Sequence, residues 1–143
     1  MKLPEHIGIS FSLSTISFAL TKNYLFALSS FLSGVFIDLD HFFDYFKSEG
    51  IKFDLHDFFH RCENYRIKKF YLLLHSYEII LLFGLIVSLT SYNSLTLGIF
   101  LGFSQHLLLD QISNGAHPLG YFFIYRWLNG FSSEYVFNNY DAR

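Results

Sequence analysis

The stretch "SQHLLLDQISNGAHP", residues 104–118, follows a long apolar run and decides how the chain is organised. Residues 79–109 contain no Asp, Glu, Lys or Arg, and the short segment "SYNS" divides them. A run of this kind predicts two apolar helices joined by a turn. The chain nevertheless places His106, Asp110 and His117 towards the far end of the second helix. Three groups with metal-binding or acid–base chemistry at the end of an apolar helix indicate a functional site.

The composition is that of a membrane protein rather than of a soluble domain. Hydrophobic residues make up 52% of the 143 residues and charged residues 15%, whereas ordinary soluble domains carry about 25% charged residues. The formal net charge of -2 leaves no basic surface of the kind that binds nucleic acid, so we expect no nucleic-acid partner. No stretch rich in Pro, Gly and Ser divides the chain, which predicts one domain. Cys62 is the single cysteine, and this excludes an internal disulfide.

Four apolar segments predict four helices. They cover residues 6–20, 24–46, 70–90 and 95–113. A helix needs about 20 apolar residues to cross a bilayer, with about 17 as a lower limit, so the last three segments are long enough and the first is short. The connections after the first and third segments are short, which makes consecutive helices antiparallel neighbours. We therefore predict an all-α fold, a bundle of four transmembrane helices.

The long connection at residues 47–69 sets the predicted orientation in the membrane. It carries six Lys and Arg residues, whereas the two short connections together hold Lys22 alone. By the positive-inside bias, the long connection and both termini face the cytoplasm. This predicts a multi-pass protein of the inner (cytoplasmic) membrane. Residues 121–131 are dense in aromatic rings and form either an interfacial helix or a cap on the bundle.

Small and polar residues recur every four positions along the predicted helices. In the fourth helix Gly98, Gly102, His106 and Asp110 share one face, and small residues at this spacing allow close packing in lipid. The other helices carry related sets: Ser30, Gly34 and Asp38 in the second, followed by Asp40 and His41; His6, Ser10 and Ser14 in the first; His75 and Glu78, three apart, in the third. In an up-down bundle all these histidines and carboxylates lie at one end, the cytoplasmic end.

The convergence of these groups predicts a metal site. Ionisable groups in membrane helices cost several kcal/mol unless they are paired or bind an ion. Imidazole and carboxylate without thiolate favour zinc, and less selectively manganese or iron, and this many ligands suit two or three ions. A single histidine near a helix end is more often hydrogen-bonded than a ligand, and we prefer that interpretation for His56. For Asp44, Asp54 and Asp57 we expect a solvated or capping role.

Five motifs carry a family resemblance. They are "DLDH" (38–41), "HR" (60–61), "LHS" (74–76), "GFSQHLLLD" (102–110) and "HPLG" (117–120), after a histidine near the N-terminus. In this order they resemble the LexA-binding, inner-membrane-associated metal-dependent hydrolase family, which is itself similar to zinc-dependent phospholipase C and the single-strand-specific zinc nucleases. The resemblance implies a helical enzyme and makes the following residues candidate ligands: His6, Asp38, Asp40, His41, His60, His75, His106, Asp110 and His117. Glu78 fits the same pattern. The resemblance leaves open which of Asp38 and Asp40 binds, and whether His60 or His41 completes a site.

Together these features predict a membrane-bound, metal-dependent hydrolase of phosphoesters, such as a phospholipid headgroup. A metal ion lowers the pKa of bound water from about 16 toward roughly 7 and stabilises charge on phosphoryl oxygens. Asp38, Asp40 or Asp110 would take the proton or bridge two ions, and Arg61 would contact a phosphate oxygen or lie at the surface. The alternative is a non-catalytic metal-binding regulator or scaffold, whose ions hold the bundle together. Ion transport is disfavoured, because the ionisable residues do not continue through the helices.

Overall fold

The computed structural model describes residues 3–64 and 66–138, which fold almost entirely into helices and loops. In chain order the elements are α1 (Leu3–Thr21), α2 (Tyr24–Phe36), the 3-10 turn η1 (Ile37–Leu39), α3 (Asp40–Glu49), α4 (Leu55–Glu63), α5 (Tyr77–Leu89), α6 (Ser94–Ser113), α7 (Phe123–Leu128) and α8 (Ser133–Val136). Within the described residues, β-type pairing is limited to two isolated bridges, Lys69 with Ser132 and Ala116 with Phe137. The predicted all-α class is confirmed.

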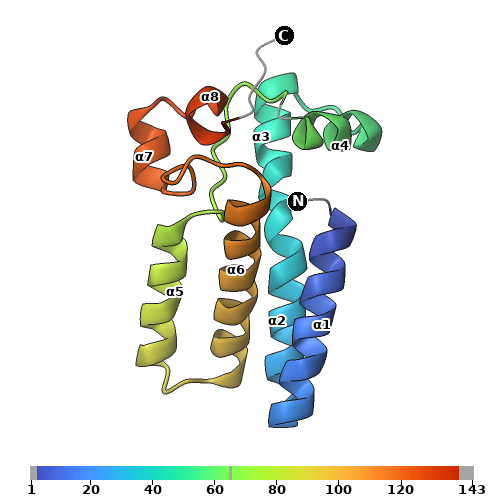
Figure 1. Ribbon diagram of the computed structural model, residues 1–143, viewed down its shortest axis with the longest axis vertical. Coiled ribbons are helices and arrows are strands. Elements are labelled where there is room, and N and C mark those ends of the chain that lie inside the picture. The colour runs from blue at the N-terminus through green and yellow to red at the C-terminus, as the bar shows by residue number, and fades with distance from the viewer. Residues whose placement is uncertain (1–2, 65, 139–143) are drawn as a thin grey trace.

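The molecule has two parts, which we call the bundle and the head (Figure 1). The bundle consists of α1, α2, α5 and α6, with α2 packed between α1 and α6, and α5 packed on the other side of α6. The head consists of α3, α4, α7, α8 and the loops at residues 66–76 and 114–122. The two short loops of the bundle lie at the end away from the head, as the up-down topology predicts.

Side-chain caps begin three of the long helices. Asn23, Ser76 and Asn93 each accept a hydrogen bond from a backbone N–H two or three residues later, which satisfies a donor that the helix itself cannot pair. Asn23 also donates from Nδ2 to the Ser94 hydroxyl at 2.7 Å. Asn23 therefore both caps the start of α2 and joins it to the start of α6, at the end of the bundle away from the head.

Glycines allow α6 to lie directly against α2. A Cβ atom on Gly98 would lie 2.5 Å from the carbonyl oxygen of Phe26, and a Cβ atom on Gly102 would lie 2.8 Å from the backbone nitrogen of Gly34. A Cβ atom on Gly34 would in turn lie 2.8 Å from the hydroxyl oxygen of Ser10 in α1. The predicted faces of small residues therefore form the helix contacts of the bundle.

The predicted helix at residues 70–90 begins at Tyr77, so the prediction is wrong for residues 70–76. Four backbone N–H groups of this loop donate to carboxylates of α3, two to Asp44 at 3.0 and 3.1 Å and two to Asp40 at 2.8 and 3.3 Å. These N–H groups are therefore not available for helical hydrogen bonds. The loop lies across the head instead of extending α5.

Residues 121–131 cap the fold. They contain the short helix α7, in which Arg126 is fully buried, and Tyr121 just before it is buried as well. Trp127 and Leu128 on the opposite side of the turn are exposed. Of the two predicted roles, the structure shows the cap, and the position of this segment at a membrane interface stays a prediction.

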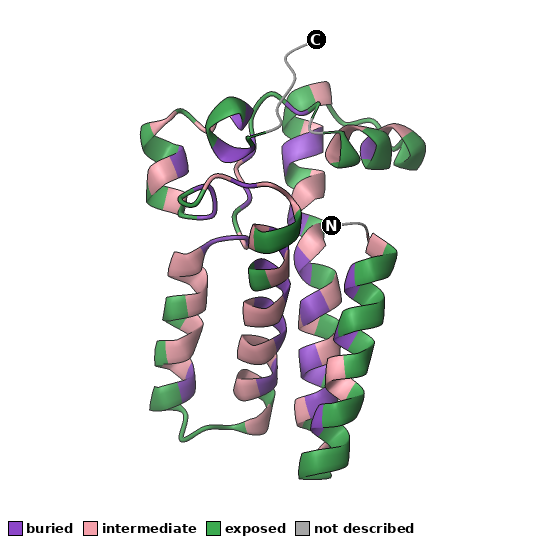
Figure 2. Ribbon diagram, viewed as in Figure 1, coloured by how far each residue is buried: buried purple, intermediate pink, exposed green. Residues whose placement is uncertain are grey.

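The two parts differ in where their apolar side chains lie (Figure 2). The buried apolar cluster belongs to the head and to the adjoining end of α6: Tyr45, Phe58, Ile67, Phe70, Leu72, Leu107, Ala116, Tyr121, Val136 and Phe137. The bundle instead exposes large apolar side chains along its outer faces, among them Phe11, Leu28, Leu81 and Leu89. Its inner faces carry the small and polar residues.

One helical run among the described residues, Tyr24–Glu49, is long and apolar enough to cross a membrane. It comprises α2, η1 and α3 and matches the predicted segment at residues 24–46. The helix α5 is apolar but shorter than a span requires. Length and composition therefore support one of the predicted spans, and the count of four stays a prediction.

Candidate metal centre

Four predicted ligands converge where the bundle meets the head. Asp38 lies in η1, His75 in the loop before α5, and His106 and Asp110 lie one turn apart in α6. One ligand atom from each of them lies within 4.8 Å of the corresponding atom of every other. We call these four residues the ligand cluster. The cluster could hold a metal ion, as the sequence predicts.

The distances within the ligand cluster match those of a coordination site. Nε2 of His75 lies 3.1 Å from Nε2 of His106. Asp38 Oδ1 lies 3.3 and 3.2 Å from these two atoms, and Asp110 Oδ2 lies 3.7 and 3.4 Å from them. Zinc binds nitrogen and oxygen at about 2.0–2.2 Å, so the ligand atoms around a tetrahedral ion are about 3.3–3.6 Å apart. The cluster needs little movement to reach that geometry.

Hydrogen bonds on the far side of both imidazoles direct their Nε2 atoms into the cluster. His106 Nδ1 lies 2.7 Å from the carbonyl oxygen of Gly34, which only accepts, so Nδ1 carries the hydrogen. His75 Nδ1 lies 3.0 and 3.1 Å from the two carboxylate oxygens of Asp40 and donates in the same way. In the neutral rings both Nε2 atoms are then acceptors that face each other and two carboxylates. A cation between them removes this repulsion, and such outer hydrogen bonds are typical of metal-binding histidines.

The site concentrates negative charge away from water. Asp40 and Asp110 are buried, and Asp38 is partly exposed. Burial alone lowers the pKa of His75, but the Asp40 and Asp38 carboxylates more than offset burial, so the pKa of this imidazole stands well above its usual value. The same two carboxylates attract a divalent cation, which would take the place of the proton on Nε2 of His75.

His6, predicted as a ligand, supports the cluster from α1. Its Nε2 atom lies 2.9 Å from Asp110 Oδ1, the oxygen that does not face the two imidazoles. Its ring stacks on the ring of His106 with 3.8 Å between centroids. His6 therefore orients Asp110 and lies outside the four residues of the ligand cluster.

His41 forms a second group with Asp40 and His75, in which one ligand atom of each residue lies within 4.8 Å of the others. Nε2 of His41 also lies 3.6 Å from Asp38 Oδ1, and its Nδ1 is buried without a hydrogen-bond partner. The two aspartates of the "DLDH" motif therefore have different places. Asp38 faces the ligand cluster, whereas Asp40 binds the outer nitrogen of His75.

Arg126 is a buried residue near the site that the sequence did not predict. Its guanidinium donates to the carbonyl oxygens of Leu72, His75 and Gly120 at 2.8, 3.0 and 2.9 Å. Burial lowers its pKa to about 10, so it keeps its charge at neutral pH. Arg126 fixes the backbone of the loop that presents His75. The signal in the sequence is a single charge within the aromatic stretch "YFFIYRWL".

The structure does not bring three predicted ligands to the cluster. Glu78 accepts hydrogen bonds from two backbone N–H groups at the start of α7, at 2.9 and 3.1 Å, so its carboxylate is engaged there. His60 is exposed on α4. His117 accepts a backbone hydrogen bond within its own turn and stacks on Tyr125. His56 is exposed on α4, and its interpretation as a hydrogen-bonded residue stays a prediction.

Arg61 and the other aspartates have structural contacts. Arg61 pairs with Asp57 and with Glu49, each at 2.9 Å, so its guanidinium is held within the head rather than offered to a phosphate. Asp54 accepts the backbone N–H of Asp57 at the start of α4, which confirms its capping role. Asp44 is buried and binds the loop before α5, so the expectation of a solvated carboxylate is wrong for this residue.

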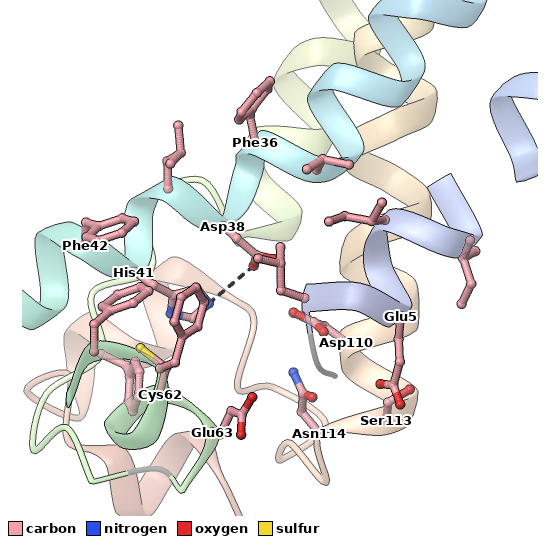
Figure 3. A pocket seen from close by; sticks show the side chains of 18 of the residues that line it. Glu5, Phe36, Asp38, His41, Phe42, Cys62, Glu63, Asp110, Ser113 and Asn114 are labelled. Carbon is pink, nitrogen blue, oxygen red and sulfur yellow. Dashed lines mark ion pairs between the residues drawn. The ribbon is translucent and has the colours of Figure 1, made fainter. Parts of the chain in front are cut away.

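An open cleft of about 900 Å³ reaches the site (Figure 3). Asp38, His41 and Asp110 form part of its wall, and Figure 3 shows Asp38 between α3 and the end of α6. Asp38 is the most exposed member of the ligand cluster. A small molecule can therefore approach the cluster from this side.

No protein-family model, curated protein or solved structure matches this chain. The resemblance of its five motifs to a hydrolase family stays an expectation from the sequence. What the site can do is argued from its own geometry.

Proposed function

We propose that this protein is a membrane-bound, metal-dependent hydrolase that cleaves phosphoesters, such as that of a phospholipid headgroup. The observation that carries the proposal is the pair of Nε2 atoms of His75 and His106, 3.1 Å apart and faced by the Asp38 and Asp110 carboxylates. This donor set favours zinc. Catalytic zinc sites bind water beside their protein ligands, and the open cleft beside Asp38 is the side from which a water would join an ion in this cluster.

The residues of the site have separable roles in this proposal. A zinc ion in the cluster would lower the pKa of a bound water to about 7 and stabilise charge on the phosphoryl oxygens. Asp38 and His41 face the cleft, and His41 is the side chain best placed to take the proton of the attacking water. His6 orients the ligand Asp110, and Asp40 orients the ligand His75. The reaction adds water across the P–O bond and releases an alcohol and a phosphate group.

The number of ions follows from the ligand groups. The described residues offer two such groups, the ligand cluster and the set of Asp40, His41 and His75. His75 belongs to both. Nδ1 of His75 carries the hydrogen that Asp40 accepts, so His75 can bind one ion at a time through Nε2. We therefore propose one ion, in the ligand cluster, instead of the two or three that the number of histidines also allows, and His41 then stays available as a base.

A membrane location is supported by the distribution of charge over the bundle. Residues 7–37 contain one charged side chain, Lys22 in the far loop, and residues 79–105 contain none. The outer faces of these helices carry exposed apolar side chains that lipid would cover. The basic residues of the head support a site at the cytoplasmic side of the inner membrane. The motif resemblance to an inner-membrane hydrolase family agrees with this arrangement.

The test uses the full chain purified in detergent. We expect elemental mass spectrometry to find one zinc ion per chain, and the protein to hydrolyse a chromogenic phosphodiester. His106→Ala should lower both metal content and hydrolysis by more than about 100-fold, because it removes a ligand rather than a supporting group. His56→Ala, an exposed histidine of the head, is the matched control and should change neither.

The second candidate function is a non-catalytic metal-binding regulator or scaffold. It is favoured by one observation: the ligands come from η1, from the loop before α5 and from α6, so an ion would tie bundle and head together. Bound zinc with no hydrolysis of any phosphoester, together with unfolding on metal removal, would support this role. A chain that takes up no transition ion would contradict both functions.

A further inference from the structure

The cleft beside the ligand cluster has an apolar part that the chemistry of hydrolysis does not need. Its lining includes Ile7 of α1, Phe36 of α2, Leu39 of η1, Phe42 of α3 and Phe59 of α4. Phe36 and Leu39 are 53% and 55% exposed, so they belong to the cleft and to the outer surface at once. The apolar wall is therefore continuous with the apolar surface of the bundle.

The other part of the cleft is polar. It contains Asp38, His41 and Asp110, and beyond them Glu63 and Asn114, which Figure 3 shows on the side away from Phe36. The lining includes no Lys or Arg among the described residues. An anionic group is therefore attracted here by a cation in the ligand cluster and not by basic side chains of the wall.

We propose that the apolar part of the cleft binds an acyl chain of a membrane phospholipid, whose phosphoester then lies at the ligand cluster. This inference rests on the proposed function, and it names the substrate as a lipid that enters from the bilayer rather than a soluble phosphoester. The cleft has a volume of about 900 Å³, within the range of about 300–1,000 Å³ that suits small ligands. A phospholipid matches both ends of the cleft, since its chain is apolar and its phosphate binds a metal ion.

The position of the cleft supports entry from lipid. It lies where α2 passes through η1 into α3, at the boundary between the apolar bundle and the charged head. Where the bilayer covers the bundle up to η1 and leaves α3 outside, this boundary is the level at which acyl chains meet headgroups. A lipid could therefore place its chain between α1, η1 and α4 without leaving the depth that it already occupies.

The experiment is photo-crosslinking with a phospholipid that carries a diazirine in its acyl chain. The full chain in detergent micelles, with and without zinc, is irradiated at increasing lipid fractions, and labelled residues are mapped by mass spectrometry. We expect saturable labelling at Phe42 and Phe59 that unlabelled phospholipid displaces. Because Trp is larger than Leu, Leu39→Trp fills part of the cleft and excludes about two methylene groups of the acyl chain. It should weaken this labelling about tenfold. Leu32→Trp, seven residues earlier on α2 and outside the cleft, is the matched control and should leave it unchanged.

Several outcomes would overturn the inference. Labelling confined to the outer bundle, or labelling that unlabelled lipid does not displace, shows that the cleft holds no acyl chain. Cross-links between two chains through the cleft assign it to a second copy of the protein. Hydrolysis of a soluble phosphodiester without saturable labelling rejects the acyl-chain site and keeps the hydrolase. Saturable labelling without any hydrolysis keeps the acyl-chain site and rejects the hydrolase.

Discussion

The bundle and the head place their apolar residues in opposite ways. In α2, Ser29 and Ser30 are buried while Leu28 and Leu32 are exposed. In the head, aromatic residues such as Tyr45 form the core, and the lysines of the connection are exposed. Small inner residues with apolar outer faces are the pattern expected of helices in lipid, whereas a core of large side chains is the pattern expected in water. One chain therefore follows two packing rules, and the ligand cluster lies at the boundary between them.

This boundary explains why the site is built from both parts. The bundle supplies His106 and Asp110 on a helix face fixed by glycine packing, and the head supplies His75 on a loop fixed by Arg126. Asp38 lies in the turn that joins the two. Four substitutions test the difference between bundle and head, each with a matched control.

The largest effect is expected in the head, from Arg126→Ala. The change leaves three buried carbonyl oxygens without a donor and should lower the free energy of unfolding by roughly 3–5 kcal/mol, measured by denaturant titration in detergent. Zinc content should fall with it, because the loop that carries His75 is released. Arg66→Ala, an exposed residue of the head, should have little effect. Unchanged stability would show that the head does not depend on this buried charge.

The next effect tests the outer face of the bundle. Leu85→Lys in α5 places a charge on a side chain that is 55% exposed, and in a bilayer it should cost about 2.5–3.5 kcal/mol of insertion free energy. Ile51→Lys in the head, at a side chain 94% exposed, should cost almost nothing. Membrane insertion assays of both variants measure the difference. Equal behaviour of the two would mean that water, not lipid, surrounds the bundle.

A smaller effect tests the inner face of the bundle. Gly102→Ala adds a Cβ atom 2.8 Å from the backbone nitrogen of Gly34 and should lower stability by about 1–3 kcal/mol. Gly8→Ala, on the open side of α1 with nothing within 4 Å, should raise stability by about 0.5–1 kcal/mol through helix propensity. Thermal unfolding in detergent measures both changes in stability, the loss for Gly102→Ala and the gain for Gly8→Ala. The idea of glycine-mediated packing fails if both variants are stabilised.

The smallest effect is expected at the contact between head and site. Asp40→Asn weakens the hydrogen bond to His75 Nδ1 and should reduce zinc affinity about tenfold, equal to about 1.4 kcal/mol, in competition with a chelator. Asp54→Asn is the control, since Asn caps a helix as well as Asp does. If Asp40→Asn leaves the zinc affinity unchanged, His75 is not a zinc ligand.

The sequence predicted the helices of the bundle and the convergence of His6, Asp38, His75, His106 and Asp110, because these follow from helical spacing and from antiparallel order. It did not predict the loop at residues 70–76, where carboxylates of α3 take up the backbone N–H groups. Apolar residues alone gave no signal that this segment leaves the helix.

The misplaced candidates have a common physical cause. Glu78 accepts hydrogen bonds from the start of α7, and Arg61 pairs with Asp57 and Glu49. Each of these charged side chains is therefore already bound to a neighbour that folding brings to it. Residue type and spacing show that such a side chain can bind an ion or a phosphate. They do not show that a neighbour has already engaged it.

The sequence by itself determined what is local: that the bundle segments are helical, which of their faces carry small residues, and that His106 and Asp110 share one face. These depend on spacing within a single helix of fixed pitch. The tertiary structure alone decided what depends on distant partners: that Asp38 faces the ligand cluster while Asp40 holds His75, and that Arg126 fixes the loop between them. Two residues apart in "DLDH", the aspartates differ because the turn at η1 directs them to different neighbours, and no regularity along the chain encodes that direction.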